Sequence, residues 1–298
     1  MKILCIGQSA YDITLPVNGY PEENKKYKID KRIECGGGSA NNAAYLLATW
    51  ENDVYLASSI GKDDYAKKIK EELAKANVNT SYFEEIEGVN TTTSYIINNL
   101  ENGSRTILTN KDSLMHFTKP LDLSFCPDII FMDGNDYEAS LDVLRKYPKA
   151  IKIIDAGSLK KGSIELCQLC DYIVCSNDFA KDYTNINFSY DDMDTIKEVY
   201  EKMAQDFNGQ LVITLESHGS FTKINDEYYL VPSIKVNSID STGAGDIYHG
   251  AFTHFIAKNY SLLETMRLSN IAGALSVTKI GSKSSMPSLF EVLNYHEL

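Results

Sequence analysis

Short apolar runs alternate with amphipathic helical stretches along most of the chain, and this alternation constrains the fold more than any other feature. Six apolar runs each fit a strand that is buried on both faces. They are residues 2–7, 53–60, 128–134, 151–157, 172–177 and 210–215. Helical patterns lie between and after them, at residues 40–49, 63–75, 138–146, 193–207, 245–258 and 262–278. Strands and helices that alternate in this way predict an α/β fold, with a mainly parallel sheet covered by helices on both faces.

Two segments break this pattern. Residues 11–34 and 91–108 alternate polar and apolar side chains as one-faced strands do, and Asn102-Gly103 is a strong hairpin signal. These strands predict a small antiparallel sheet over one edge of the parallel sheet, serving as a lid, a dimerisation surface or both. The sequence has no internal repeat, low-complexity tract or long linker. We therefore expect one domain over residues 1–298, with the lid strands inserted into it.

Charge and cysteine content narrow the class of protein. The chain has 41 acidic and 29 basic residues, a net charge of −12, which argues against nucleic acid or an anionic membrane as a partner. Its N-terminal apolar run is too short for a signal peptide, and no run reaches the roughly 18 apolar residues of a membrane span. Cys167 and Cys170 form a CxxC pair, but no second pair or nearby histidine completes a zinc set. We expect a cytoplasmic protein with reduced cysteines.

The run "DSTGAGDIYHG" places small residues directly before a carboxylate and a helical pattern. Gly243, Ala244 and Gly245 let the backbone approach a ligand closely, and the following helix start presents unpaired N–H groups and a positive dipole end. These features suit an anion, above all a phosphate. Asp246 would repel a phosphate unless its carboxylate has a chemical role. Taken alone, the run is equally consistent with an ordinary glycine turn before a helix.

A second small-residue run, "GGGSANN" at residues 36–42, precedes the first helical pattern. Its glycines permit close backbone approach, and the amides of Asn41 and Asn42 can donate and accept hydrogen bonds as sugar hydroxyls require. Asp12 follows the first strand, at the edge where open α/β sheets bind ligands. A glycine turn with asparagines near a helix start is the alternative interpretation. His249 and His254 have the wrong spacing to bind one metal from a shared helical face.

Together, the two runs resemble the two signatures of the ribokinase-like (PfkB) carbohydrate kinases. Their order fits this family, as does their separation of about two hundred residues, and the resemblance covers essentially the whole chain. It implies a ribokinase-like three-layer sandwich. The segments "GSRTIL" and "CSNDFAKDY" look more particularly like the ketohexokinase branch, while "NKKYKI", "GAGDIYHGAF" and "GSKSSMP" also resemble bacterial sulfofructose kinases.

The resemblance implies a role for each run. Asp246 would be the base that accepts the proton of the sugar hydroxyl, while the N–H groups of residues 243–246 form the anion hole for the transferring phosphoryl group. Sugar contacts fall on Asp12, Gly37 and Asn41. Arg105 lies where the ketohexokinase branch has an arginine that reaches from the lid toward the nucleotide phosphates.

The same resemblance implies nucleotide and cation sites elsewhere in the chain. The turn "TLESHG", with Thr214 and Gly219, matches the nucleotide side, although Glu216 replaces the glycine usual there. Asn270 is a candidate adenine-side residue. A monovalent-cation site, possible for K⁺, is implied by a set of four residues. These are Asp240, Thr242, Gly281 and Ser285.

One departure from the family pattern affects the magnesium site. The N-x-x-E motif, whose glutamate helps organise the magnesium waters, would begin at Asn177, but its fourth residue is Ala180. The ketohexokinase and sulfofructose kinase branches also lack this glutamate. We expect an ATP- and Mg²⁺-dependent kinase that phosphorylates a primary hydroxyl of a small sugar, a ketose in preference, and that forms a homodimer through its lid strands. The alternatives are a nucleoside kinase of the same fold and a catalytically silent sugar- or nucleotide-binding regulator.

Overall fold

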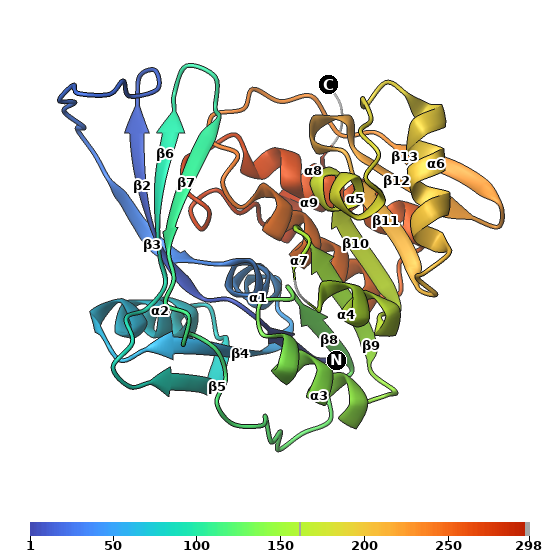
Figure 1. Ribbon diagram of the computed structural model, residues 1–298, viewed down its shortest axis with the longest axis horizontal. Coiled ribbons are helices and arrows are strands. Elements are labelled where there is room, and N and C mark those ends of the chain that lie inside the picture. Colours follow the sequence, from blue (N-terminus) through green and yellow to red (C-terminus); the bar gives the residue numbers. More distant parts are fainter. Residues whose placement is uncertain (161, 296–298) are drawn as a thin grey trace.

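The structure is a computed structural model that describes residues 1–160 and 162–295. Two β-sheets and the helices around the larger one make up the molecule (Figure 1). The helices are α1 (Ser39–Thr49), α2 (Asp64–Lys75), α3 (Tyr137–Lys146), α4 (Ser163–Leu169), α5 (Asn177–Thr184), α6 (Met193–Ala204), α7 (Ala244–Ala257), α8 (Leu262–Ser276) and α9 (Leu289–Leu293), with one 3₁₀ turn, η1 (Glu216–His218).

The large sheet has nine strands in the order β13-β12-β11-β10-β9-β8-β1-β4-β5. The strands are β1 (Lys2–Ile6), β4 (Asp53–Gly61), β5 (Asn79–Ile86), β8 (Ile129–Met132), β9 (Ile151–Ala156), β10 (Tyr172–Ser176), β11 (Gln210–Thr214), β12 (Ser220–Ile224) and β13 (Glu227–Val231). Neighbours from β5 to β11 pair in parallel, and β12 and β13 add an antiparallel hairpin at one edge. The predicted parallel core is therefore confirmed.

Helices cover both faces of this sheet. In β1, Ile3 and Cys5 pack with α1, α2 and α7 on one face, whereas Leu4 and Ile6 pack with α3, α4, α5 and α6 on the other. All four side chains are 0% exposed, which explains why the strand is apolar at every position and not only at alternate ones. This arrangement has the three layers that the α/β prediction implied.

The small sheet has the strand order β3-β2-β6-β7 and projects from the large sheet on one side (Figure 1). Its strands are β2 (Ala10–Val17), β3 (Ile33–Gly37), β6 (Thr93–Asn99) and β7 (Arg105–Asn110). The prediction of a purely antiparallel sheet is wrong for the central pair, because β2 and β6 run parallel. Each hairpin is antiparallel, but the long connection between them contains α1, β4, α2 and β5, and such a crossover permits parallel pairing.

Candidate active site

A cavity of about 240 Å³ lies between the small sheet and the first turns of α1 and α7. The predicted site residues that line it are Asp12, Arg105, Thr242, Gly243, Gly245 and Asp246. The predicted site residues outside this lining are Gly37, Asn41, Thr214, Gly219, Asp240, Ala244, Asn270, Gly281 and Ser285. The two small-residue runs therefore meet at one cavity, as the sequence predicts.

The start of α7 forms one wall of the cavity. Gly243 is the N-cap of this helix and has a φ of 78°, in the left-handed region that favours glycine. Because the helix begins at Ala244, its first N–H groups have no carbonyl one turn earlier to accept them. The N–H of Ala244 turns back to the carbonyl of Ser241 at 3.3 Å. A Cβ added at Gly245 would meet no atom within 4 Å, so this wall is open to a ligand.

Asn42 directly contacts Asp246, and sequence reasoning did not single it out for this position. Its Nδ2 donates to Oδ2 of Asp246 at 2.7 Å, and its side chain is 2% exposed. The donor orientation is fixed because the amide oxygen would repel the carboxylate. With Oδ2 held in this way, the other carboxylate oxygen of Asp246 is the one left to accept a proton or hydrogen bond. No signal in the sequence joins two residues so far apart.

Asp12 faces Asp246 from the small sheet, since both line the cavity. Burial raises the pKa of the Asp12 carboxyl to about 6, with the neighbouring Asp246 charge contributing, while a hydrogen bond from Ser94 opposes the shift. Gly37 lies on the neighbouring strand, against the Asp12 side chain. A Cβ at Gly37 would stand 2.0 Å from Asp12 Oδ2, so only glycine leaves room for this carboxylate.

Asn41 lies behind the cavity and has internal partners. Its Nδ2 donates to Ser9 Oγ at 3.3 Å, and its Oδ1 accepts from Lys283 Nζ at 2.6 Å. Burial lowers the pKa of Lys283 to about 8, although surrounding carboxylates, including Glu72, oppose this shift. The structure therefore places Asn42, not Asn41, in the cavity. The predicted sugar contact of Asn41 remains a prediction that would require its present partners to change.

Arg105 links the small sheet to the loop that leads into α7. Its Nη1 donates to Ser241 Oγ, whose hydroxyl in turn donates to the carbonyl of Gly103 at 3.3 Å. Asn98 on β6 donates to the carbonyl of Ile239 at 3.4 Å. The β6–β7 hairpin is thus hydrogen-bonded to the residues directly before the predicted anion-binding turn.

The three predicted nucleotide-side residues gather at the β11–β12 hairpin, outside the cavity lining. Thr214 ends β11 and donates to the carbonyl of Cys175 at 3.2 Å. Gly219 follows η1 with a φ of 104°, and a Cβ there would lie 2.1 Å from the carbonyl of Val231. The amide nitrogen of Asn270 donates to that same carbonyl at 2.9 Å. Asn270 therefore anchors β13, which leaves its predicted contact with adenine untested.

The four residues of the predicted cation site do come together. The carboxylate of Asp240 accepts from the N–H of Thr242 and from the N–H of Gly281, each at 2.9 Å. The N–H of Ser285 donates to the carbonyl of Gly281 at 3.1 Å. The hydroxyl oxygen of Thr242 is buried and has no hydrogen-bond partner among the described residues. This cluster ties the start of α7 to the loop after α8.

Comparison with known families identifies the chain. The sequence profile described as pfkB family carbohydrate kinase matches residues 1–289. The chain belongs to the pfkB family of carbohydrate kinases. It is 26% identical to a ribokinase of Lactococcus lactis, with 98% of this chain and 95% of that protein covered. It is 25% identical to a deoxyribokinase of Salmonella typhi, with 100% and 99% covered. The predicted enzyme class, a phosphotransferase with an alcohol acceptor, is thereby confirmed.

Solved structures show the same fold. A putative ribokinase from Agrobacterium tumefaciens superposes with a TM-score of 0.86 at 23% identity, covering 98% of this chain and 96% of that one. The ribokinase of Arabidopsis thaliana complexed with ribose and ATP superposes with a TM-score of 0.80 at 20% identity, covering 99% of both chains. The predicted ribokinase-like fold is confirmed, whereas the ketohexokinase or sulfofructose kinase branch is not. Within residues 1–160 and 162–295, no helix is both long and apolar enough to cross a membrane.

The altered magnesium motif of this pfkB-family kinase has a structural setting. Ala180 on α5 is 0% exposed and packs in the hydrophobic core on one face of the large sheet. Asn177, at the start of the same helix, donates to the hydroxyl of Tyr190 at 2.8 Å. Glu216, at the family's glycine position, has a φ of 51° and interacts with the same hydroxyl. No group of three or more His, Cys, Asp or Glu residues in the described part of the chain forms a ready metal cage. The amide of Asn177 and the carboxylate of Glu216 lie at one hydroxyl, and oxygen ligands of this kind are those that Mg²⁺ takes.

Proposed function

We propose that this chain transfers the γ-phosphoryl group of ATP to a primary hydroxyl of a small sugar. The observation that supports this most is the shared cavity, in which the Asp246 carboxylate adjoins the free N–H groups at the start of α7. A base and an anion-binding turn are needed side by side, because the attacking hydroxyl and the phosphoryl group must meet within contact distance. Asp12 supplies a second carboxylate to hold another hydroxyl of the same sugar.

The proposed reaction follows from these positions. The sugar oxygen attacks the γ-phosphorus, the bond from that phosphorus to the bridging oxygen of ADP breaks, and the hydroxyl proton passes to the free oxygen of Asp246. The N–H groups of Gly245 and Asp246 stabilise the charge on the transferring phosphoryl oxygens. Asn42 holds the base in position through its 2.7 Å hydrogen bond. When bound with ATP, Mg²⁺ would neutralise phosphate charge, with Asn177 and Glu216 as the candidates to orient its waters.

The size of the cavity favours a free sugar over a nucleoside. Its volume of about 240 Å³ lies below the 300–1,000 Å³ that is usual for sites of larger organic ligands. The relatives include kinases named for sugars and kinases named for nucleosides. A nucleoside kinase of Methanocaldococcus jannaschii is 24% identical, with 98% of this chain and 95% of that protein covered. A nucleoside acceptor is therefore the second candidate.

The preferred sugar is a separate question. From the "GSRTIL" segment and Ala180 we expect a ketohexose to be preferred over ribose by at least about tenfold in kcat/KM, a difference of about 1.4 kcal/mol. The relatives named ribokinase and deoxyribokinase give this expectation no support, and they favour a pentose. The ketose preference stays a prediction, and ribose as clearly the best substrate would contradict it.

A coupled ADP-release screen tests the proposed function. The acceptors are fructose, tagatose, psicose, ribose, deoxyribose, a sulfonated sugar and inosine, each with ATP and Mg²⁺. We expect acceptor-dependent ADP release with at least one free sugar and little with inosine. A protein that binds sugar and ATP without acceptor-dependent ADP release would instead be a silent regulator.

We also propose that K⁺ binds at the Asp240 cluster and raises activity. The buried hydroxyl oxygen of Thr242 has no partner among the described residues, which supports an added ligand there. The observation against it is that the Asp240 carboxylate already joins the two loops directly. Assays at equal ionic strength in KCl and in NaCl separate these outcomes.

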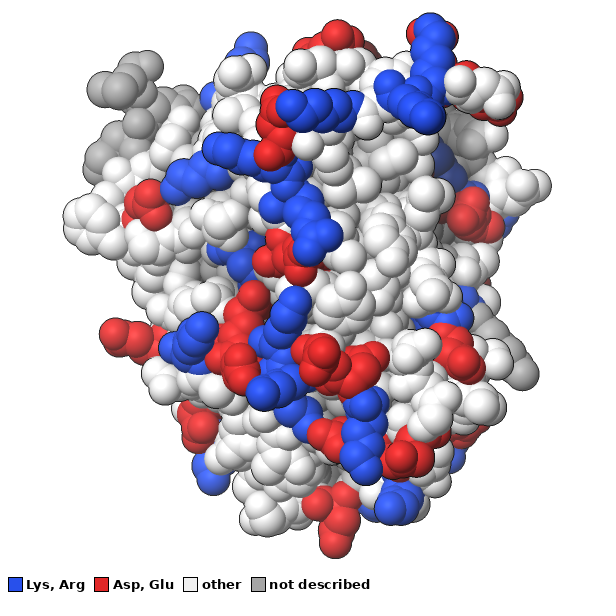
Figure 2. Space-filling model, turned by 90° about the vertical axis from the view of Figure 1, so that its left-hand side faces the viewer, with Lys and Arg blue, Asp and Glu red and all other residues white. Residues whose placement is uncertain are grey.

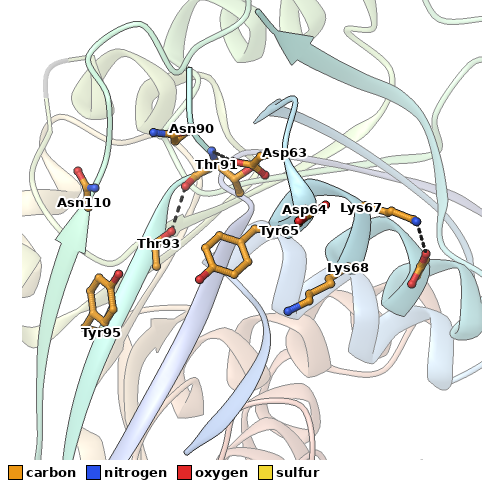
Figure 3. A pocket seen from close by; sticks show the side chains of 11 residues that line it. Asp63, Asp64, Tyr65, Lys67, Lys68, Asn90, Thr91, Thr93, Tyr95 and Asn110 are labelled. Atoms are coloured by element: carbon orange, nitrogen blue, oxygen red, sulfur yellow. Dashed lines mark hydrogen bonds and ion pairs between the residues drawn. The ribbon is translucent and has the colours of Figure 1, made fainter. Parts of the chain in front are cut away.

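Finally, we propose a homodimer formed through the outer face of the small sheet. Tyr95 on β6 and Leu108 on β7 face each other across the ladder and are 43% and 57% exposed. Figure 2 shows this side of the molecule, where uncharged surface adjoins a band of mixed acidic and basic side chains. A hollow of about 720 Å³ lies between this sheet and the start of α2, with Tyr65 and Tyr95 on its walls (Figure 3). Apolar strands left partly exposed beside a hollow suit contact with a second chain.

A further inference from the structure

His249 lies one helical turn after Gly245 in α7, beneath the proposed anion hole. Its side chain is 3% exposed, so its ring contacts protein atoms and not solvent. Its Nδ1 lies 2.6 Å from the carbonyl oxygen of Gly245. Its Nε2 lies 3.1 Å from the carbonyl oxygen of Val174 and 3.4 Å from Oδ1 of Asp155. The ring therefore bridges the catalytic helix and the carboxyl ends of β9 and β10.

Every polar neighbour of this ring is a hydrogen-bond acceptor. A carbonyl oxygen cannot donate, so Nδ1 must carry the hydrogen of its 2.6 Å bond to Gly245. The shorter contact, 2.6 Å from Nδ1 to the Gly245 carbonyl oxygen, is the bond that ties the ring to the start of α7.

Asp155 is the side chain that contacts the far side of the ring, with its Oδ1 3.4 Å from Nε2 of His249. It is 5% exposed and is the register partner of Val174, so the two neighbouring strands present both acceptors to the same ring nitrogen. Burial raises the pKa of Asp155 to about 6, and His249 opposes this rise. The other charged groups acting on Asp155 are Asp246 and Asp133, which are negative, and Lys160, which is positive.

We propose that His249, paired with Asp155, is a positioning residue that holds the Gly245–Asp246 peptide in the orientation the anion hole needs. The inference rests on the proposed function, because it gives this peptide a role in phosphoryl transfer. The Gly245 carbonyl and the Asp246 N–H belong to one planar peptide unit, so fixing the oxygen fixes the direction of the N–H. A donor on the carbonyl also polarises the peptide and strengthens its N–H as a donor.

Two substitutions separate the two bonds of the ring. The amide nitrogen of asparagine lies near the position of Nδ1, so His249→Asn can keep the bond to Gly245 and lose the bonds of Nε2. The longer glutamine places its amide nitrogen near Nε2, so His249→Gln keeps the bond to Val174 and loses the bond to Gly245. His254→Asn is the control, since His254 is on the same helix and 2% exposed but contacts Trp50 and Asn52.

The kinetic expectation follows from these geometries. With the best acceptor of the screen, His249→Gln should lower kcat by about tenfold to a hundredfold, somewhat less than complete loss of an anion-hole donor. The KM for ATP should stay within twofold, because the anion hole acts on the transition state. His249→Asn should keep kcat within about fivefold of the parent, and His254→Asn within twofold. Equal losses in His249→Asn and His249→Gln, or no loss in either, would overturn the proposal.

A measurement independent of activity is available because Gly245–Asp246 is the only Gly-Asp pair in the chain. Protein labelled with ¹³C-carbonyl glycine and ¹⁵N-aspartate gives one amide signal in an HNCO spectrum, which reports on this peptide alone. In His249→Gln the Gly245 carbonyl carbon and the Asp246 amide proton should both move upfield, while His249→Asn and His254→Asn leave them near the parent values. An unmoved signal in His249→Gln would refute the inferred bond.

The same labelling distinguishes failure of this inference from failure of the proposed function. A parent protein that phosphorylates no acceptor in the screen refutes the proposed function, yet the HNCO signal still reports on the His249–Gly245 bond. If the His249 variants do not fold, as judged by circular dichroism, the parent itself is labelled with ¹⁵N-histidine and ¹³C-carbonyl glycine. A correlation across the hydrogen bond from Nδ1–H to the Gly245 carbonyl is then expected. The proposal would be overturned if Nδ1 of His249 were found to carry no hydrogen.

Discussion

The two sheets are built differently, and the difference separates two tasks at the cavity. All residues of β8 in the large sheet are 0% exposed, whereas most of β7 in the small sheet is exposed. The packed sheet and α7 hold Asp246 and its turn, while the small sheet contributes Asp12 and Arg105 to the opposite wall. Changes on the large-sheet side should therefore act mainly on kcat. Changes on the small-sheet side should act mainly on binding of the acceptor.

The largest expected effect is on the proposed base. Asp246→Asn should lower kcat by a factor of roughly 10² to 10⁴, the range of general-base catalysis, with little change in the KM for ATP. Steady-state kinetics with the best acceptor measures this. Asp194→Asn is the control, because the Asp194 side chain is 94% exposed on α6. Activity of Asp246→Asn within a few-fold of the parent would remove Asp246 from the mechanism.

The next effect is on the residue that contacts the base. Asn42→Leu keeps the shape of the side chain but loses its 2.7 Å hydrogen bond to Asp246, a bond to a charged group. Such bonds contribute about 1.5–3 kcal/mol, so kcat should fall by about tenfold to a hundredfold. Asn52→Leu, which loses an amide far from the cavity, should cost stability but not kcat. Equal kcat in Asn42→Leu and the parent would show that Asp246 is positioned without Asn42.

On the small-sheet side, we expect a pH dependence from Asp12. Its pKa is raised to about 6 by burial, and only the ionised carboxylate can accept hydrogen bonds from two sugar hydroxyls. Below pH 6 the carboxylate gains a proton, so kcat/KM for the sugar should fall about tenfold per pH unit. Asp12→Asn should have a lower kcat/KM at pH 8 and no acidic limb near pH 6. A limb that persists in Asp12→Asn would belong to another group, such as Asp155.

The smallest effect on turnover is expected at the outer face of the small sheet. Leu108→Glu places a charge in the proposed dimer contact, so light scattering should show dissociation at micromolar concentration. The KM for the sugar should rise about threefold and kcat stay within twofold, because the proposed catalytic turn lies at the start of α7 and not on the small sheet. Leu230→Glu is the control, since Leu230 is an equally apolar residue that is 42% exposed on β13. A parent protein that is monomeric and fully active would rule out the dimer.

The sequence predicts the positions of local features better than their long-range pairing. Helix α7 and its glycine turn follow from the run that ends at Asp246, because small residues and a helix start are adjacent in the chain. The contact of Asn42 with that aspartate could not be predicted, since it depends on the packing of α1 against α7. The internal position of Asn41 could not be predicted either. Asn42, the next residue in α1, points about 100° away from Asn41 around the helix axis, and it reaches the cavity in place of Asn41.

Two further features of the fold were not predicted from the sequence, the β12–β13 hairpin and the parallel pairing of β2 with β6. The β12–β13 hairpin turns at Asn225 and Asp226, whose φ angles of 48° and 66° fit a two-residue turn that asparagine and aspartate tolerate. This turn is the local signal from which the β12–β13 hairpin, absent from the predicted strands, follows. The parallel pairing of β2 with β6 has no local signal, because these strands are joined through two helices and two strands of the large sheet.

The hydrogen bond between Asn42 and Asp246 also has a consequence for how the protein is made. It joins residues 204 positions apart, and the Arg105–Ser241 bond joins residues 136 apart. Contacts of such long sequence separation form late, because the chain must first close large loops. During synthesis, the first two thirds of the polypeptide can build most of the parallel sheet before the proposed base, Asp246, and its turn are made. We therefore expect a growing chain on the ribosome to transfer no phosphoryl group until its last third has emerged and folded.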